Sequence, residues 1–153
     1  MQKARDIMEK NPYICREDAT IGDVIKQLFD SQISGVPIVD GRNKILGYVT
    51  DVDLMRYVTH EKPKVFSWGD MTPVIIDDEP ISEKMRDILS VPALSIANKK
   101  RHYVDADLEL DEVADLFENE RVLKMAVIEN DQVVGVVSRS AVLRQLLANI
   151  LPE

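Results

Sequence analysis

The hydrophobic pattern in the middle of the chain predicts a β-hairpin that leads directly into a helix. Two apolar runs, Val36–Val39 and Ile45–Val49, flank the polar segment Asp40–Lys44, which contains a glycine and an asparagine. These two residue types readily adopt the positive backbone angles of a tight turn, so the runs are expected to pair as antiparallel strands. The second strand runs into Thr50, and the apolar spacing behind it predicts a helix over about Asp51–Val58.

An amphipathic helix is predicted upstream of this hairpin. Thr20 has the side chain of a good N-cap residue, and a short extended piece over Tyr13–Cys15 precedes it. The apolar residues behind Thr20 recur at intervals of three and four, which is the spacing of one buried helical stripe. They are Ile21, Val24, Ile25, Leu28 and Phe29. The predicted order of elements is therefore β-α-β-β-α.

The same order of elements returns near the C-terminus. Residues 109–143 repeat the pattern of residues 20–54 almost step for step, with Ser138 at the position of Thr50 and a slightly shorter hairpin turn. An internal duplication of this length predicts two similar units that pack on each other. We therefore expect a mixed α/β (α+β) protein built from two repeats.

The stretch between the two repeats has a different composition. Residues 61–81 contain three prolines, which disfavour regular structure. The stretch is nevertheless too apolar for a free linker, so we expect it to fold over a groove or a dimer contact, with a dedicated partner site as the alternative. The repeats are accordingly predicted over residues 1–60 and 82–153, on either side of this irregular connection.

Composition and charge argue against several classes of protein. Hydrophobic residues make up 45% and charged residues 30% of the chain, which is ordinary for a soluble globular protein. No apolar run approaches the roughly 18 residues of a membrane span, and residues 1–6 do not resemble a signal peptide. A net charge of −8 opposes general binding to nucleic acid or to an anionic membrane. It leaves small anionic ligands open, because these respond to local donors.

Catalytic and metal-binding motifs are absent from the sequence. It contains no glycine-rich phosphate loop, no His-Glu-x-x-His and no Cys-x-x-Cys. His60 and His102 have no metal-ligand spacing with Cys15. We therefore expect no catalytic residue, no metal site and no required cofactor. Because Cys15 is the only cysteine, no disulfide can form within the chain, and a reducing cytoplasm is the simplest location.

Two stretches carry candidate binding chemistry. The basic run Lys99–His102 is expected to be a solvated loop, with a phosphate contact as the alternative. Thr50-x-x-Asp53 has the pattern of a capping box, which would only close the start of a helix. The pattern also suits a nucleotide, because Thr50 and the first helical amides can hold a phosphate while Asp53 accepts hydrogen bonds from a ribose diol.

The duplicated motif resembles the cystathionine-β-synthase (CBS) domain, a family that occurs in pairs as a Bateman module. The resemblance covers nearly the whole chain except residues 59–80 and 95–107. It implies two β-α-β-β-α units related by pseudo-twofold symmetry, with two equivalent clefts between their sheets. The segments that carry the resemblance are 35–40 and 45–54, together with the upstream Asp6-Ile7-Met8, Asn11-Pro12 and Asp18-Ala19-Thr20-Ile21.

The resemblance also implies which residues would line the two clefts. In the first cleft, one unit would supply Tyr48, Thr50 and Asp53 for the phosphate and ribose of an adenosyl ligand. The other unit would supply apolar walls for the base, namely Leu108, Val113, Val122 and Leu123. The second cleft would use Val136, Ser138 and Arg139, together with Ala19, Val24, Ile33, Ser34 and Gly35.

The second cleft departs from the family pattern. Ala141 stands where the first cleft has Asp53, so it offers no acceptor for a ribose diol. We therefore expect adenosine nucleotides to fill only the first cleft. Ser138 and Arg139 would still allow a phosphate or another small anion in the second, and a cleft filled by side chains is the alternative.

Together these implications predict a regulatory, ligand-sensing module. It would bind AMP, ADP, ATP or S-adenosylmethionine and relay the occupancy of its cleft to an unknown regulated protein. Apolar helix stripes over residues 54–58 and 142–150 predict a homodimer. The alternative function is a dimeric interaction or scaffold module that binds no ligand. No nucleic-acid or membrane partner is expected.

Overall fold

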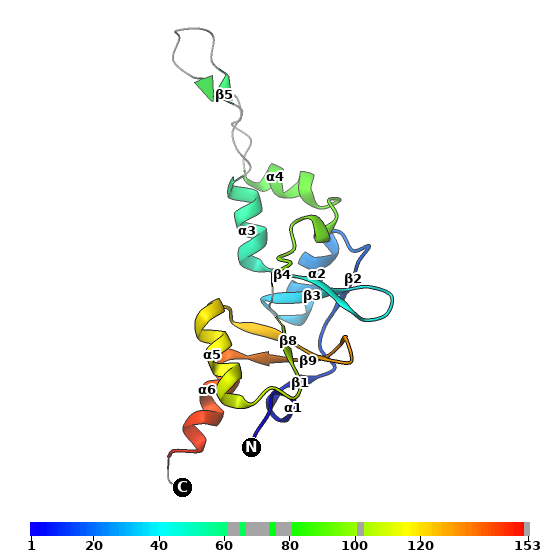
Figure 1. The fold of residues 1–153 in the computed structure, drawn as a ribbon. Coiled ribbons are helices and arrows are strands. Elements are labelled where there is room, and N and C mark those ends of the chain that lie inside the picture. The colour runs from blue at the N-terminus through cyan, green and yellow to red at the C-terminus, as the bar shows by residue number, and fades with distance from the viewer. Residues whose placement is uncertain (61–64, 67–73, 76–80, 101–102, 152–153) are drawn as a thin grey trace.

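The chain folds into two units of similar topology, which Figure 1 shows in the computed structural model. The structure describes residues 1–60, 65–66, 74–75, 81–100 and 103–151. The sheets of the two units lie next to each other in the middle of the molecule, and the helices lie toward the outside (Figure 1).

The first unit is built on a three-stranded sheet. In this sheet β2 (Cys15–Arg16) runs parallel to β3 (Gly35–Val39), and β3 pairs antiparallel with β4 (Ile45–Thr50). The helix α2 (Ile21–Ser31) connects β2 to β3, and α3 (Asp51–His60) follows β4 without a gap. This is the predicted β-α-β-β-α order, with the hairpin formed by the two apolar runs.

The second unit repeats this arrangement. Its strand β7 (Tyr103–Asp105) runs parallel to β8 (Lys124–Glu129), and β8 pairs antiparallel with β9 (Gln132–Ser138). The helix α5 (Leu110–Glu120) connects β7 to β8, and α6 (Arg139–Ala148) follows β9. The second sheet has a fourth strand, which the N-terminal segment contributes.

The two units correspond in detail, as the duplication predicts. Both hairpins carry a register shift at the same step, after Ile38 in the first unit and after Val127 in the second. Both connecting helices end on a residue in the left-handed conformation, Gln32 after α2 and Arg121 after α5. The mixed α+β class and the pairing of two repeats are therefore confirmed.

The segment that lies directly before each unit in the sequence packs into the core of the other unit. The N-terminal α1 (Ala4–Ile7) and β1 (Glu9–Lys10) belong to the second unit, because β1 pairs with β9 and Ala4 is buried in the second core. The later helices α4 (Ile81–Ile88) and η1 (Ala93–Ser95, a 3-10 helix) pack on the first core instead. This exchange ties the two units together.

Arg5 anchors α1 to the second unit. Its Nη2 atom is 2.7 Å from Asp107 Oδ1 and 2.8 Å from Glu129 Oε1. The hydrogen bonds from Arg5 are the main reason why the pKa of Asp107 is lowered in the fold. A residue near the N-terminus is thus held by partners more than a hundred positions away in the sequence.

A small apolar cluster joins the two sheets. Val39 of the first unit is buried against Ala126 and Val133 of the second. Beside this cluster, Val133 N donates to Asn43 O at 3.0 Å, and Asn43 Nδ2 donates to Val133 O at 2.9 Å. The two hairpins are therefore fixed against each other, and this contact sets the geometry of the space between the units.

Two expectations from the sequence need comment. Ile21, Val24 and Leu28 of α2 are buried as predicted, but Phe29 is 79% exposed, so its place in the buried stripe was wrong. Phe29 lies at the edge of the stripe, where the turn of the helix directs it to solvent. The prediction for residues 61–81 falls mostly outside the described residues. In the described part of this stretch, β5 (Val65–Phe66) pairs antiparallel with β6 (Val74–Ile75).

Candidate functional site

A cavity of about 290 Å³ lies between the two units, and we name it cleft 1. Tyr48, Thr50 and Asp53 line it from the first unit. Val122 and Leu123 line it from the second unit, at the turn between α5 and β8. The structure therefore brings together five of the residues that the sequence assigned to one site.

Thr50 and Asp53 form a capping box at the start of α3. The Thr50 amide donates to Asp53 Oδ2 at 2.9 Å, and the Asp53 amide donates back to Thr50 Oγ1 at 3.2 Å. The Thr50 hydroxyl also donates to Asp53 Oδ2, at 2.9 Å. The other carboxylate oxygen, Asp53 Oδ1, is 3.5 Å from Nη1 of the exposed Arg56. That distance is long for a hydrogen bond, so Oδ1 retains most of its capacity to accept one.

The backbone amides at the start of α3 already have hydrogen-bond acceptors. Asp51 N donates to Ser34 O at 2.8 Å, and Val52 N donates to the Asp51 carboxylate at 2.7 Å. The Asp53 amide is used by the capping box. A phosphate at this helix start would have to displace the Asp51 carboxylate, so these amides form a weaker phosphate cradle than the sequence suggested.

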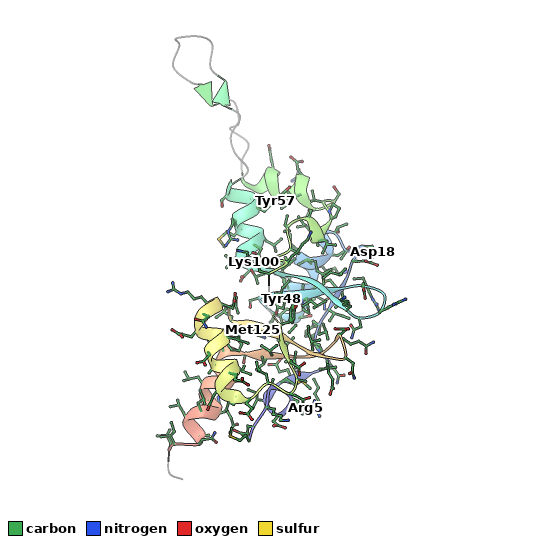
Figure 2. The ribbon with its side chains drawn as sticks, in the orientation of Figure 1. Arg5, Asp18, Tyr48, Tyr57, Lys100 and Met125 are labelled. Carbon is green, nitrogen blue, oxygen red and sulfur yellow. The ribbon has the colours of Figure 1, made fainter. Side chains whose placement is uncertain are left out.

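Tyr48 places a buried phenol in cleft 1, where the two units meet (Figure 2). The residue is 4% exposed, and its hydroxyl has no hydrogen-bond partner among the residues that the structure describes. Burial disfavours the phenolate and raises the pKa of Tyr48 to about 12, and the Glu9 carboxylate acts in the same direction. The ring lies over Gly35, where a Cβ atom would be 2.7 Å from Tyr48 Cε1. Glycine at position 35 therefore makes room for the tyrosine.

Three cationic side chains that the sequence did not single out also line cleft 1. Arg56 comes from α3, Arg121 from the turn between α5 and β8, and Lys124 from the start of β8. Neither a motif nor a periodic pattern marks them, because their proximity to Thr50 depends on how the units pack. An equal number of carboxylates lines the same cavity: Asp51, Asp53 and Glu120.

Asn98 closes one side of cleft 1. Its backbone exchanges two hydrogen bonds with that of Tyr48, at 3.0 and 2.9 Å, although residues 95–107 depart from the family pattern. Ser34 and Gly35, which were expected in the second cleft, also line cleft 1. They do so because β3 pairs Gly35 directly with Thr50.

The remaining residues predicted for the first cleft lie elsewhere. Val113 is fully buried in the core of the second unit. Leu108 packs against the same core and lines a separate surface hollow with Tyr103 and Glu112. The apolar wall of cleft 1 is therefore shorter than expected and includes Val122 and Leu123.

The other residues predicted for the second cleft are dispersed. Ala19 and Val24 lie in the first core, and Val136 is buried in β9. Ile33 and Arg139 line two separate surface hollows. The structure does not gather these residues around one cavity.

Ser138 caps α6 much as Thr50 caps α3. Its Oγ atom accepts a hydrogen bond from the Ala141 amide at 3.1 Å. Ala141 has no side-chain oxygen that could return a hydrogen bond, so this cap is half of a capping box. The equivalent starts of α3 and α6 thus differ by one carboxyl group.

Metal-binding and membrane-spanning features are not found in the described part of the chain. There, no group of three or more His, Cys, Asp or Glu side chains is placed to hold a metal ion. Nor does any helix of that part combine the length and the hydropathy that a bilayer crossing requires.

Comparison with known proteins identifies the family. The sequence model of the CBS domain matches residues 4–60 and again residues 85–148, so the chain belongs to the CBS-domain family and contains a tandem pair. A similar protein is the uncharacterized protein MJ1426 of Methanocaldococcus jannaschii. It is 22% identical over 152 residues, which are 94% of this chain and 90% of the relative.

Solved structures of CBS proteins share the fold. CBSX2 in complex with AMP superposes with a TM-score of 0.72 at 16% identity, over 99% of this chain and 100% of that chain. The CBS domain pair of protein MJ0100, in complex with 5′-methylthioadenosine and S-adenosyl-L-methionine, gives a TM-score of 0.69 at 20% identity. That match covers 97% of this chain and 98% of the other. At these identities the similarity demonstrates the fold.

Proposed function

We propose that this CBS pair is a regulatory module that senses an adenine nucleotide or a related adenosyl ligand in cleft 1. The observation that carries the proposal is the make-up of the cavity. A weakly engaged acceptor, Asp53 Oδ1, shares it with the apolar side chains of Val122 and Leu123. A nucleoside needs both features, an acceptor for its ribose hydroxyls and apolar surface for its base.

Four residues of cleft 1 have a proposed role. Asp53 Oδ1 accepts hydrogen bonds from the ribose, while Oδ2 stays in the capping box. Val122 and Leu123 contact the base, and the hydroxyl of Tyr48, which has no partner among the described residues, adds a hydrogen bond. AMP in CBSX2, and S-adenosyl-L-methionine with 5′-methylthioadenosine in MJ0100, support the adenosyl class of ligand. The proposed ligands are thus AMP, ADP, ATP or S-adenosylmethionine.

Regulation follows from the position of cleft 1 between the units. A ligand shifts a conformational equilibrium only as far as it binds one state better than another. Because cleft 1 takes its lining from both units, a bound ligand contacts both and is sensitive to their relative arrangement. The proposed consequence is that occupancy of the cleft is relayed to a regulated protein.

The proposed assembly is a homodimer. Large apolar side chains remain exposed on the described helices, among them Phe29 and Met55 of the first unit and Leu143 of the second. A closed twofold dimer would remove such surfaces from water. Light scattering should give the mass of a dimer at micromolar concentration, and a monomer would reject this assembly. The buried free thiol of Cys15 suits the proposed cytoplasmic location.

A second candidate function is a ligand-free dimeric scaffold. The specific observation that favours it is the satisfied start of α3, where the capping box is complete and the first amides have acceptors. In this case Thr50 and Asp53 would stabilise the helix and nothing else.

Thermal unfolding and titration calorimetry with adenosine, AMP, ATP and S-adenosylmethionine separate the two functions. A ligand at a hundred times its dissociation constant stabilises the fold by about 2.7 kcal/mol. The sensor should bind one nucleotide per chain, because Ala141 leaves the second motif without a ribose acceptor. If no adenosyl ligand produces heat or a thermal shift, the scaffold is the better description.

A further inference from the structure

A second cavity, of about 320 Å³, adjoins cleft 1. It is lined by Lys44, Lys99 and Lys100, and we name it the lysine cavity. Tyr48 and Asn98 line both cavities, so the two meet at these residues. Each cavity alone is near the lower end of the roughly 300–1,000 Å³ range of ligand sites. Together they suit a ligand longer than a nucleoside.

The three lysines of this cavity are exposed, and none is within ion-pair distance of a described carboxylate. Lys44 interacts at longer range with Asp40, whose pKa is lowered first by the backbone amides of Lys44 and Arg42 and then by their charges, whereas Lys99 and Lys100 have no such partner among the described residues. Asp105 and Asp131 line the same cavity, and one oxygen of Asp105 already accepts the Asp107 amide at 2.8 Å. Three lysines against two carboxylates leave the lining locally positive in a chain whose net charge is −8. Such a surface attracts a multiply charged anion.

Cleft 1 by itself offers less to a phosphate group. Its cations are matched by an equal number of carboxylates, and the amides of Asp51, Val52 and Asp53 already have acceptors. The phosphate end of a nucleotide in cleft 1 would therefore gain more from the lysines on the other side of Tyr48 than from the start of α3.

Tyr48 stands at the junction with a hydroxyl that has no partner among the described residues. A buried polar group without a partner is unfavourable unless a ligand supplies one. The phenol is neutral at neutral pH, and burial stabilises this form further because it raises the pKa of Tyr48 to about 12. The neutral hydroxyl can donate to a phosphate oxygen that passes between the cavities.

We propose that the ligand is an adenosine nucleotide whose nucleoside lies in cleft 1 and whose phosphates extend past Tyr48 into the lysine cavity. The inference rests on the proposed function of cleft 1 and chooses among its ligands. Affinity rises with the number of phosphates. S-adenosylmethionine binds weakly, because its sulfonium and ammonium groups carry positive charge and meet the lysines.

The test is calorimetry with adenosine, AMP, ADP and ATP in Mg²⁺-free buffer at constant ionic strength. Wild-type protein should bind ATP about tenfold more tightly than AMP, which is the effect of one added charged hydrogen bond. The double variant Lys99→Gln/Lys100→Gln should bind adenosine as the wild type does but lose most of the gain from AMP to ATP. The control Lys26→Gln/Arg144→Gln removes the same charge outside both cavities and should keep that gain.

The failures of the two proposals are distinguishable. A flat series from AMP to ATP in the wild type, or an unchanged gain in the lysine variant, would overturn this inference and leave the proposed function intact. Absence of binding by every adenosyl ligand would overturn both. Tyr48→Phe removes only a hydroxyl that has no partner among the described residues, so it should weaken ATP binding about tenfold without lowering the unfolding temperature. Unchanged ATP affinity in this variant would remove Tyr48 from the path of the phosphates.

Discussion

The starts of α3 and α6 occupy equivalent positions in the duplicated fold but present different chemistry. Thr50 caps α3 and Ser138 caps α6, and each side-chain oxygen accepts the amide three residues further on, at 3.2 and 3.1 Å. That third residue is Asp53 in the first unit and Ala141 in the second. Helix α3 therefore begins with a full capping box and a spare carboxylate oxygen, whereas α6 begins with a cap alone.

The difference extends to the strands beside the caps. The residue paired with the cap residue is Gly35 in the first unit and Lys124 in the second. Glycine makes room for the ring of Tyr48, and the equivalent of that tyrosine is Val136. The duplicated backbone is thus preserved while three side-chain positions have diverged. The proposal that only one of the two clefts binds a nucleotide therefore rests on these few side chains, because the backbone of the two units is alike.

The largest expected effect comes from removing the spare carboxylate. Asp53→Ala should weaken binding of an adenosine nucleotide by about ten- to a hundred-fold, because the ribose loses hydrogen bonds to a charged acceptor. Titration calorimetry measures the change.

The matched control for this variant is Asp23→Ala. Asp23 completes the same type of capping box with Thr20 at the start of α2, where Thr20 N donates to Asp23 Oδ2 at 2.9 Å. It lines neither cleft 1 nor the lysine cavity. Both variants should lose stability through the broken capping box, but only Asp53→Ala should lose affinity. Equal affinity in the two folded variants would reduce Asp53 to a capping residue.

Gly35→Ala should destabilise the first unit by about 1–3 kcal/mol, which is typical of overpacking. The new Cβ atom would lie 2.7 Å from Tyr48 Cε1 and 3.1 Å from Thr50 Cγ2. Denaturant unfolding measures the loss. Gly41→Ala is the control, because nothing lies within 4 Å of a Cβ atom at that position. If both variants unfold alike, the packing of the tyrosine ring on Gly35 has been overestimated.

The caps should also differ in their dependence on pH. Hydrogen bonds from Thr20 lower the pKa of Asp23, so the contribution of this carboxylate is complete above its unfolded value of about 4 and fades as the pH falls through the lower folded value. Ser138 has no titrating partner in its cap. Ser138→Ala should therefore cost about 0.5–2 kcal/mol at both pH 7 and pH 3.

Asp23→Asn is the comparison for that measurement. Its cost should be present at pH 7 and shrink toward pH 3, because the wild-type carboxylate is then increasingly protonated in the unfolded state. Denaturant unfolding at the two pH values gives both numbers. A cost of Asp23→Asn that does not change with pH would contradict the lowered pKa.

The smallest expected effect is a gain in stability. Ala141→Asp should complete the capping box of α6 and add roughly 0.5–1 kcal/mol to the stability. We expect the nucleotide stoichiometry to remain one per chain, because Val136 and Lys124 still differ from the tyrosine and glycine of the first unit. If calorimetry finds two nucleotides per chain in this variant, the missing carboxylate alone would explain why the second motif of the wild type binds none.

The sequence by itself determined the secondary structure and the local chemistry of the site. The apolar runs paired as the β3–β4 hairpin, and Thr20 capped α2, because strand alternation, helical spacing and caps depend on residues a few positions apart. Thr50 and Asp53 met for the same reason, since three residues span less than one helical turn. The duplication and the family resemblance then predicted that a second unit would supply an apolar wall.

The tertiary structure alone decided which segments meet across the units. It exchanged the N-terminal segments between the two cores, buried Val113 in one of them and placed Asn98 against Tyr48. Lys99 and Lys100 are exposed outside the helices and strands, as expected, but only the tertiary structure placed them along a cavity beside that tyrosine. Such contacts join residues tens of positions apart, so they depend on competition among all possible packings of the chain. No local pattern of apolar and polar residues records the outcome of that competition.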